Sequence, residues 1–504
     1  MKKVVGNKTW GLMLCTILVL TSVLSGCGNA ENEEAGNSSK SPSTAASPST
    51  TVDVSTDVAA EEIVNVSMMN IYHTDTAPAD DDAVIKSVEE ISKADLKMTY
   101  VPSNVYAEKI NVTMASGEMP QIIMVDNPFT TSIINGIESG MFWDITPYLD
   151  EFPNLANYNE QMLNNLQIDG KMYVIPRPRP LVRNGLVIRK DWLEKVGLEL
   201  PTTVDEFYHL VKAFKEKDPD SNGKDDTYGM MLYEGVIPAD LYSWFGAPNN
   251  WKVEDGKFIK DIETAEYKEG LKFVRKLYSE GLVNANFPVV VRNEARKDLY
   301  NNKVGISLEP LDAVVTFYYF QMEETKNHFD LIAGHPIAGK AFATAGHYGG
   351  AMIPKTSVKT EDELKKVLRY FDTQNSAEAT EKFTKLVTEN EEKPGDEKFN
   401  IDDLKNLIVN NAAMYPPGKS ELNVMLKSRM EEHSAVSISD PSIGLISPTQ
   451  IEKGEQLKTV LQDASIQFIL GKIDEASLDA AIEQWKKIGG SQVAKELAEL
   501  YSQK

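Results

Sequence analysis

The stretch RKDWLEKVGLELPTTVDEFYHLVKAFKEKDPDSNGKDDTYG, residues 189–229, decides the fold of this chain. Asp191 can cap a first short helix, which Gly197 ends. The capping box Thr203-Val-Asp-Glu206 predicts that a second helix begins there. Apolar side chains then recur at helical spacing and predict a face buried in a core, not a cofactor site: Val204, Phe207, Val211 and Phe214.

An oxygen-rich loop, DPDSNGKDDTYG at residues 218–229, follows the second helix. Its spacing can aim several oxygen atoms at one cation, as in the first nine positions of an EF-hand loop. The candidate calcium ligands are Asp218, Asp220, Asn222, Lys224 through its carbonyl, and Asp226. The twelfth position is Gly229, where an EF-hand has a bidentate glutamate, so a solvated turn of Asp, Asn and Gly is the alternative. Calcium would act here as a structural clip.

The first 60 residues predict export and a lipid anchor. Three lysines precede a mostly apolar run, residues 9–24, which is typical of a secretory signal. The run ends in LSGC, which matches the bacterial lipobox, so cleavage after residue 26 would leave Cys27 to carry the lipid. A membrane-spanning anchor or a signal cut elsewhere is the alternative. Residues 27–60 are rich in Ser, Thr and Ala and predict a flexible tether, which places the folded body at the extracellular face of the cytoplasmic membrane.

Composition argues against several classes of function. Cys15 lies in the predicted signal and Cys27 would be lipidated, so the mature chain has no thiol for a disulfide or a zinc site. Removal of residues 1–26 takes three of 52 basic residues and none of 75 acidic ones, which leaves 49 against 75 and a net charge of −26. Such an excess argues against nucleic-acid binding. The six histidines lack metal spacing and no GxSxG, P-loop or GxGxxG motif is present, so catalysis is unsupported.

Strands alternate with helices in the body, residues 61–504. The predicted strands are 63–70, 96–101 and 122–125, and the predicted helices are 83–93 and 106–116. This order predicts a mostly parallel sheet of α/β type, which binds ligands at the carboxyl ends of its strands. By that position Tyr72, Asp126 and Asn127 are ligand candidates, and Glu309 joins them after a later strand at 304–308. The first three could instead be helix caps or polar loop residues.

Two further groups of residues suit a sugar ligand. Arg177 and Arg179 lie among prolines in DGKMYVIPRPRP, residues 169–180, which predicts a stiff crossing between lobes. Their guanidinium groups could hold a carboxylate or a pair of hydroxyls, or else form surface ion pairs. Trp244 and Trp251 lie in LYSWFGAPNNW, where their rings could stack on sugars or form a small core under the loop.

The stretch 188–229 resembles the signature region of family 1 solute-binding proteins of carbohydrate ABC importers, and most of all the large lipoproteins of bacilli. The resemblance covers nearly all of residues 61–504 and includes ASGEMPQIIMV, DGKMYVIP, YSEGLVNANF, NKVGISL and ILGKIDEASLDAAIEQWKKIGG. It implies a two-lobed periplasmic-binding-protein-like fold, each lobe a sheet flanked by helices, with the ligand between the lobes. Relatives that bind acidic oligosaccharides have a calcium loop of this form. A further acidic ligand in some of them corresponds to Thr227 here.

Both lobes are expected to be discontinuous in sequence. The first would comprise residues 61–178 and about 345–405, and the second residues 179–344 and about 406–504. The motif HYGGAMIP, residues 347–354, predicts a return crossing with Gly349 and Gly350 as flexible points.

The resemblance implies that the protein captures an oligosaccharide outside the membrane and delivers it to an ABC permease. Arg177, Arg179 and Arg183 favour an acidic oligosaccharide. We expect a monomer. Two other classes stay open at this point: an extracellular polysaccharide-degrading lipoprotein enzyme, since carboxylate pairs are common in so acidic a chain, and a surface adhesin or sensory accessory protein.

Overall fold

A computed structural model describes residues 63–503 apart from several short segments. The segments left out are 74–76, 157, 159, 236, 315–317, 319–321, 323–326, 395–396 and 411–419. The predicted signal, Cys27 and the tether therefore lie outside the described residues. Within the described part of the chain, no helix combines the length and the apolar character that crossing a membrane would require.

Five strands form the first sheet, in the order β2-β1-β3-β12-β4. Their bounds are β1 Val64–Tyr72, β2 Ala94–Pro102, β3 Ile122–Val125, β4 Ile175–Pro178 and β12 His347–Met352. β1 pairs in parallel with β2 and β3, whereas β12 runs antiparallel to both β3 and β4. All four residues of β3 are buried, which agrees with its unbroken apolar sequence and its central place.

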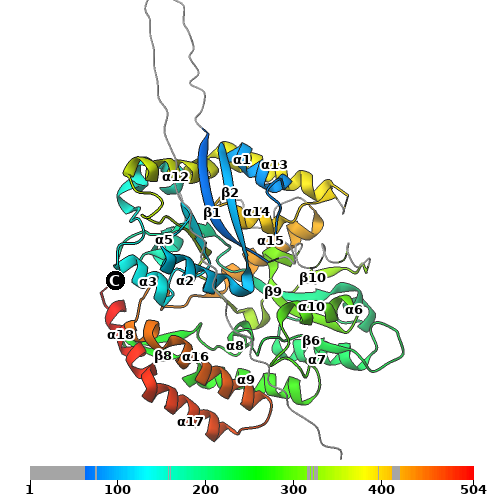
Figure 1. The fold of residues 1–504 in the computed structure, drawn as a ribbon. Coiled ribbons are helices and arrows are strands. Elements are labelled where there is room, and N and C mark those ends of the chain that lie inside the picture. Colours follow the sequence, from blue (N-terminus) through cyan, green and yellow to red (C-terminus); the bar gives the residue numbers. More distant parts are fainter. Residues whose placement is uncertain are drawn as a thin grey trace, which may run out of the picture. The chain divides into compact units, whose positions relative to one another are not determined.

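Helices cover this sheet and enclose the first hydrophobic core (Figure 1). They are α1 Ala83–Ser92, α2 Tyr106–Ser116, α3 Thr131–Glu138, α4 Pro153–Ala156, α5 Glu160–Leu166, α12 Glu361–Gln374, α13 Ala377–Glu392 and α14 Ile401–Leu407. In α1, the Asp82 carboxylate accepts from the Val84 N–H, and a stripe of apolar side chains at helical spacing is buried. We call this sheet and its helices the first lobe.

The second sheet has four strands in the order β10-β5-β9-β6. Their bounds are β5 Asn184–Arg189, β6 Tyr228–Met230, β9 Val304–Pro310 and β10 Leu331–Ala333. β5 is antiparallel to β9 and β10, and β6 is parallel to β9. Alternate residues of β5 face opposite sides, so Leu186 and Ile188 pack in one core and Val187 in another.

Helices also cover the second sheet, which with them forms the second lobe (Figure 1). The larger core includes α6 Lys190–Val196, α7 Val204–Glu216, α8 Asp240–Ser243, α9 Ala265–Ser279, α16 Pro448–Ile469, α17 Glu475–Trp485 and α18 Ser491–Tyr501. The smaller core includes α10 Arg292–Tyr300 and α15 Glu421–Ala435. Two short pairs complete the strands: β7 Trp251–Glu254 with β8 Lys257–Lys260, and β11 Ala341–Phe342 with β13 Ser437–Ile438. The predicted α/β class and two-lobed arrangement are confirmed, whereas the residue boundaries of the lobes stay a prediction.

The stretch 189–229 folds largely as its local signals predict. Thr203 and Glu206 form the capping box of α7, and Gly197 ends α6 in the left-handed conformation at φ 70°. The predicted cap at Asp191 is wrong, because α6 begins at Lys190 and the Asp191 carboxylate pairs with the Arg189 guanidinium at 2.6 Å.

The return strand β12 shows that two glycines serve close packing. A Cβ at Gly349, whose φ is +57°, would lie 1.8 Å from the Val125 carbonyl oxygen, and one at Gly350 would lie 2.0 Å from that of Ile175. The prediction that these glycines are flexible points is therefore wrong, because neighbouring strands approach their backbone on both sides.

Candidate functional site

The carboxyl ends of the first sheet gather polar side chains at one edge. β4 is antiparallel to β12, which is antiparallel to β3, so β1, β3 and β4 end together and β12 begins there. Tyr72 closes β1 with its ring edge against Tyr100. Asp126 and Asn127 follow β3, where each carboxylate or amide oxygen accepts from a nearby backbone N–H at 2.9 and 3.0 Å. These two side chains therefore shape a turn at the edge where ligands are expected.

Arg177 is fully buried near the end of β4. Its Nε donates to the Tyr348 carbonyl at 3.0 Å and its Nη1 to the Asn406 side-chain oxygen at 3.2 Å. The Tyr348 ring lies against the guanidinium, 4.6 Å from its carbon to the ring centroid. The Nη2 group is buried and has no hydrogen-bond partner among the described residues. An unpartnered donor of a buried cation is costly.

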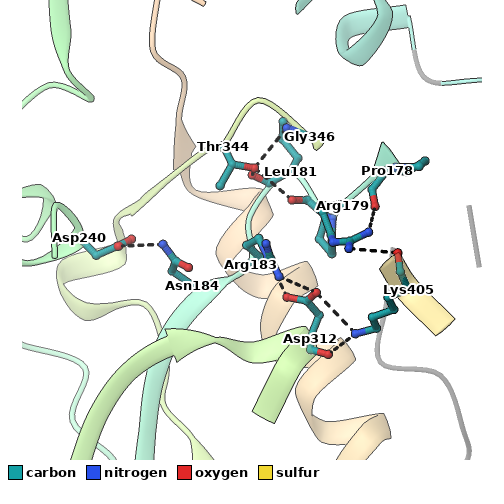
Figure 2. Close-up of polar contacts among 11 residues, drawn as sticks. Pro178, Arg179, Leu181, Arg183, Asn184, Asp240, Asp312, Thr344, Gly346 and Lys405 are labelled. Carbon is teal, nitrogen blue, oxygen red and sulfur yellow. Dashed lines mark hydrogen bonds and ion pairs between the residues drawn. The ribbon is translucent and has the colours of Figure 1, made fainter. Parts of the chain in front are cut away.

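Four further charged residues surround the crossing from the first lobe to the second, and Figure 2 shows them together. Arg183 forms a bidentate pair with Asp312 at 2.9 Å for both bonds. Lys405 of α14 donates to the Asp312 backbone carbonyl at 2.6 Å and lies 3.7 Å from its carboxylate. Arg179 donates to the carbonyls of Pro178 and Lys405. We call Arg177, Arg179, Arg183, Asp312 and Lys405 the junction cluster.

The junction cluster contains four cations and one carboxylate. Burial, together with repulsion from Arg177 and Arg183, lowers the pKa of Arg179 to about 9 against the opposing effect of Asp312 and Asp402. Burial likewise lowers the pKa of Arg177 and of Lys405. Burial alone would raise the pKa of Asp312, but Arg183 and Lys405 outweigh it and lower that pKa. The prediction of Arg177 and Arg179 as surface ion-pair partners is wrong, since both are buried and neither contacts a carboxylate among the described residues. Within the cluster the cations outnumber the carboxylate, while Asp402 acts on Arg177, Arg179 and Lys405 from outside the cluster and opposes the lowering of their pKa.

Glu309 lies at the carboxyl end of β9 but is already satisfied. Its carboxylate accepts two hydrogen bonds from Arg296, at 2.9 and 2.8 Å, and one from the Tyr318 hydroxyl at 2.9 Å. The side chain is completely buried. The prediction of Glu309 as a ligand contact is therefore wrong in this structure, because an internal arginine occupies its oxygens.

Trp244 and Trp251 are core residues of the second lobe, each 6% exposed. Trp244 packs edge-on against Phe207, with ring centroids 4.8 Å apart, and Trp251 packs against Phe258 and Trp485. The prediction that their rings stack on sugars is wrong, because other side chains cover them. The alternative of a core under the loop describes them.

Sequence reasoning missed Tyr348, Asp312 and Lys405. Asp312 follows the end of β9, so the rule that selected Glu309 could also have found it. Tyr348 was inside the predicted return crossing. Lys405 carried no local signal, because its partner Asp312 lies 93 residues away in sequence.

The oxygen-rich loop is held by hydrogen bonds among its own residues. The Asn222 amide nitrogen donates to Asp220 at 2.6 Å and to Asp226 at 3.0 Å, and the Gly223 N–H donates to Asp218 at 3.0 Å. Burial and the neighbouring Asp218 raise the pKa of Asp220. Across the residues described, no group of three or more His, Cys, Asp or Glu is arranged to hold a metal ion. The candidate calcium ligands of this loop are all oxygen atoms, the type that calcium prefers. In this structure the Asn222 amide nitrogen lies between two of their carboxylates, those of Asp220 and Asp226.

A groove of about 800 Å³ lies beside this loop and not at the junction cluster. Its lining mixes both charges, including Tyr208, Lys212, Lys215, Asp225 and Glu280. Two of its lining residues, Lys215 and Asp225, form an ion pair at 2.5 Å.

Comparisons with known proteins agree with this architecture. Residues 77–381 match the family model described as bacterial extracellular solute-binding protein. Lipoprotein LipO of Bacillus subtilis (strain 168) is 36% identical over 84% of this chain and 90% of its own length. The polygalacturonan/rhamnogalacturonan-binding protein YtcQ of the same organism is 33% identical over 99% of both chains.

A solved structure shows the same fold. It is the EF-hand mutant of the ABC-transporter substrate-binding protein FusA of Streptococcus pneumoniae in complex with fructo-nystose. Its TM-score is 0.61 at 18% identity, and the match covers 87% of this chain and 99% of that one. The family model and the two relatives go further than the fold. The chain belongs to the bacterial extracellular solute-binding protein family.

Proposed function

We propose that this protein is the substrate-binding component of an ABC importer and that it captures an acidic oligosaccharide outside the membrane for delivery to a permease. The observation that carries the proposal is the junction cluster, in which Arg177, Arg179 and Lys405 are buried and Arg183 is partly buried, with Asp312 as its one carboxylate. The Arg177 Nη2 is unpartnered among the described residues. A uronate carboxylate is an acceptor of the right charge and size for a guanidinium fork.

The arrangement of the strands supports a ligand between the lobes. β9 of the second sheet ends beside the start of β5, and residues 179–183 connect that edge to the carboxyl edge of the first sheet. A ligand held from both edges would favour a closed form of the protein by population shift. We assign the lobes to residues 61–178 with about 345–405 and to residues 179–344 with about 406–504. Tyr72, Asp126 and Asn127 are the rim contacts in this proposal.

The relatives support the class of ligand. YtcQ is named for binding polygalacturonan and rhamnogalacturonan, two polymers that contain acidic sugars, and it is similar along its whole length. FusA is named as an ABC-transporter substrate-binding protein. Both are named for binding or transport, which supports a binding protein over the polysaccharide-degrading enzyme.

Two features would serve the ligand site indirectly. Lipidation of Cys27, with residues 28–60 as the tether, would hold the body at the outer face of the membrane near the permease. Calcium held by Asp218, Asp220, Asn222, Asp226 and the Lys224 carbonyl would link the loop at the end of α7 and supply no chemistry to the ligand.

Calorimetric titration with trigalacturonate and with its methyl ester tests the proposal. We expect the acid to bind and the neutral ester to bind at least about tenfold more weakly, because a hydrogen bond to a charged group contributes about 1.5–3 kcal/mol. The Arg177→Gln, Arg179→Gln double variant should lose the preference for the acid, whereas Arg177→Lys should retain part of it.

Three results would contradict the proposal. Equal affinity for acid and ester in the wild-type protein would remove the role of the junction cluster. Unchanged affinity in a double variant that unfolds cooperatively would do the same. New reducing ends after incubation with polygalacturonan would establish the enzyme instead.

A further inference from the structure

Arg292 presents a guanidinium group on the second lobe that its neighbours only partly engage. Its carbon lies 4.9 Å from the centroid of the Tyr233 ring, which fixes the orientation of the fork. Its contact with the Glu234 carboxylate is long, at 4.0 Å, and the Arg292 side chain is 46% exposed. The other Glu234 oxygen accepts from the Arg292 backbone N–H at 3.1 Å, which holds that carboxylate at the start of α10. Such a long, exposed ion pair contributes little and leaves the fork open to a stronger acceptor.

The Arg292 side chain belongs to the edge of the second sheet that meets the first lobe. Tyr233 and Glu234 follow β6, and β6 is parallel to β9. The end of β9 leads to Asp312, which contacts Lys405 of the first lobe. Tyr233 and Asp312 of the junction cluster therefore both follow strands that end at the same edge of the second sheet.

The pKa of His73, a residue of the first lobe, is affected by Arg292 of the second lobe. It follows β1, and its ring lies 6.3 Å from that of Tyr348, the residue stacked on Arg177. Its pKa is lowered by burial, raised by Asp402, and lowered by Arg177, Arg179 and Arg292 together. The side chain is nevertheless solvent-accessible. Arginines of both lobes therefore act electrostatically on this one exposed histidine.

We propose that Arg292, held on the Tyr233 ring, is a second carboxylate subsite on the lobe opposite Arg177, so that the preferred ligand carries at least two acidic sugars. This inference rests on the proposed function and specifies its substrate class. A ligand with two carboxylates would bind a cation on each lobe at once, and that bridging would stabilise the closed form. A single uronate would satisfy only one lobe.

Titration of wild-type protein and three variants with galacturonate and trigalacturonate tests the inference. We expect Arg292→Gln to weaken trigalacturonate binding about tenfold, the size of one charge-assisted hydrogen bond, and to leave galacturonate unchanged. Arg292→Lys keeps the charge without the fork and should recover part of the loss. Lys297→Gln, also on α10 and paired with Glu294 at 2.6 Å, is the matched control and should change neither affinity.

A fourth variant separates direct contact from a general loss of charge. Glu234→Gln frees Arg292 from its acidic neighbour and should tighten trigalacturonate binding more than galacturonate binding. Equal losses for the two ligands in Arg292→Gln, or the same loss in Lys297→Gln, would overturn the second subsite while leaving the proposed function standing. Absence of any galacturonate or trigalacturonate binding to the wild-type protein would overturn both.

Discussion

Arg296 of α10 and Arg177 of β4 are both buried, yet their surroundings differ. Arg296 faces the two oxygens of Glu309 at 2.9 and 2.8 Å, so the pair is matched inside the second lobe. Arg177 contacts only carbonyl and amide oxygens and an aromatic ring, and its Nη2 is unpartnered among the described residues. In the Arg296–Glu309 pair each charge has its partner within the protein, so a structural role accounts for both residues. Because Glu309 already has its partner and the Arg177 Nη2 has none among the described residues, our proposal places the ligand at Arg177 and not at Glu309.

Breaking the matched pair should have the largest effect. Glu309→Ala leaves Arg296 buried without its carboxylate and should lower the free energy of unfolding by about 3–5 kcal/mol, as measured by urea denaturation. Glu294→Ala, whose exposed carboxylate pairs with Lys297, is the control and should cost less than about 1 kcal/mol. A similar small loss in both variants would show that the buried pair is not the structural element described here.

Removing the unmatched arginine should affect ligand binding more than stability. Arg177→Gln should weaken trigalacturonate binding by about 2 kcal/mol, roughly 30-fold, in a calorimetric titration. Its free energy of unfolding should fall by only about 1 kcal/mol, because the lost hydrogen bonds are offset by relief of like-charge repulsion. A stability loss as large as that of Glu309→Ala, with affinity intact, would reverse the assignment of roles.

Asp240 is an unmatched charge of the opposite sign and gives a pH test. Burial raises its pKa from 3.8 to about 6, although Asn184 and backbone N–H groups oppose that shift. The folded state therefore keeps the proton up to about pH 6, whereas the unfolded chain loses it near pH 3.8, so this contribution to stability is lost as pH rises through that window.

Asp240→Asn should accordingly raise the free energy of unfolding at pH 7.5 by about 1–2 kcal/mol and have little effect at pH 4. Urea denaturation at both pH values measures this. Asp255→Asn, at an exposed turn, is the control and should show no pH-dependent difference. An equal effect of Asp240→Asn at the two pH values would contradict the raised pKa.

The candidate calcium ligands of the oxygen-rich loop lie near solvent, so their effect should be the smallest. Calcium several-fold above its Kd should stabilise the protein by about 1 kcal/mol, seen as a rise in Tm that chelation reverses. Asp226→Asn should abolish the response, whereas Asp225→Asn, which is outside the ligand set and pairs with Lys215, should keep it. An unchanged Tm of the wild-type protein after chelation would favour a solvated turn.

Local signals in the sequence determined the class of fold. The capping box at Thr203, the stripe along α7 and the unbroken apolar run of β3 act over a few residues, so they can be recognised without tertiary contacts. The strand-end rule placed Tyr72, Asp126 and Asn127 at one edge for the same reason.

Only the tertiary structure decided which of those candidates are free to bind a ligand. The sequence around Trp244 and Trp251 does not distinguish them from exposed tryptophans that stack on sugars. In the structure Phe207 packs on Trp244 and Trp485 packs on Trp251. Matching of charge likewise depends on partners distant in sequence, since Arg183 and Lys405 meet at Asp312 over separations of 129 and 93 residues. The sequence by itself determined the elements and their order, because these follow from short-range periodicity and capping. The balance of buried charge, and hence the site, follows from long-range packing, which no local pattern encodes.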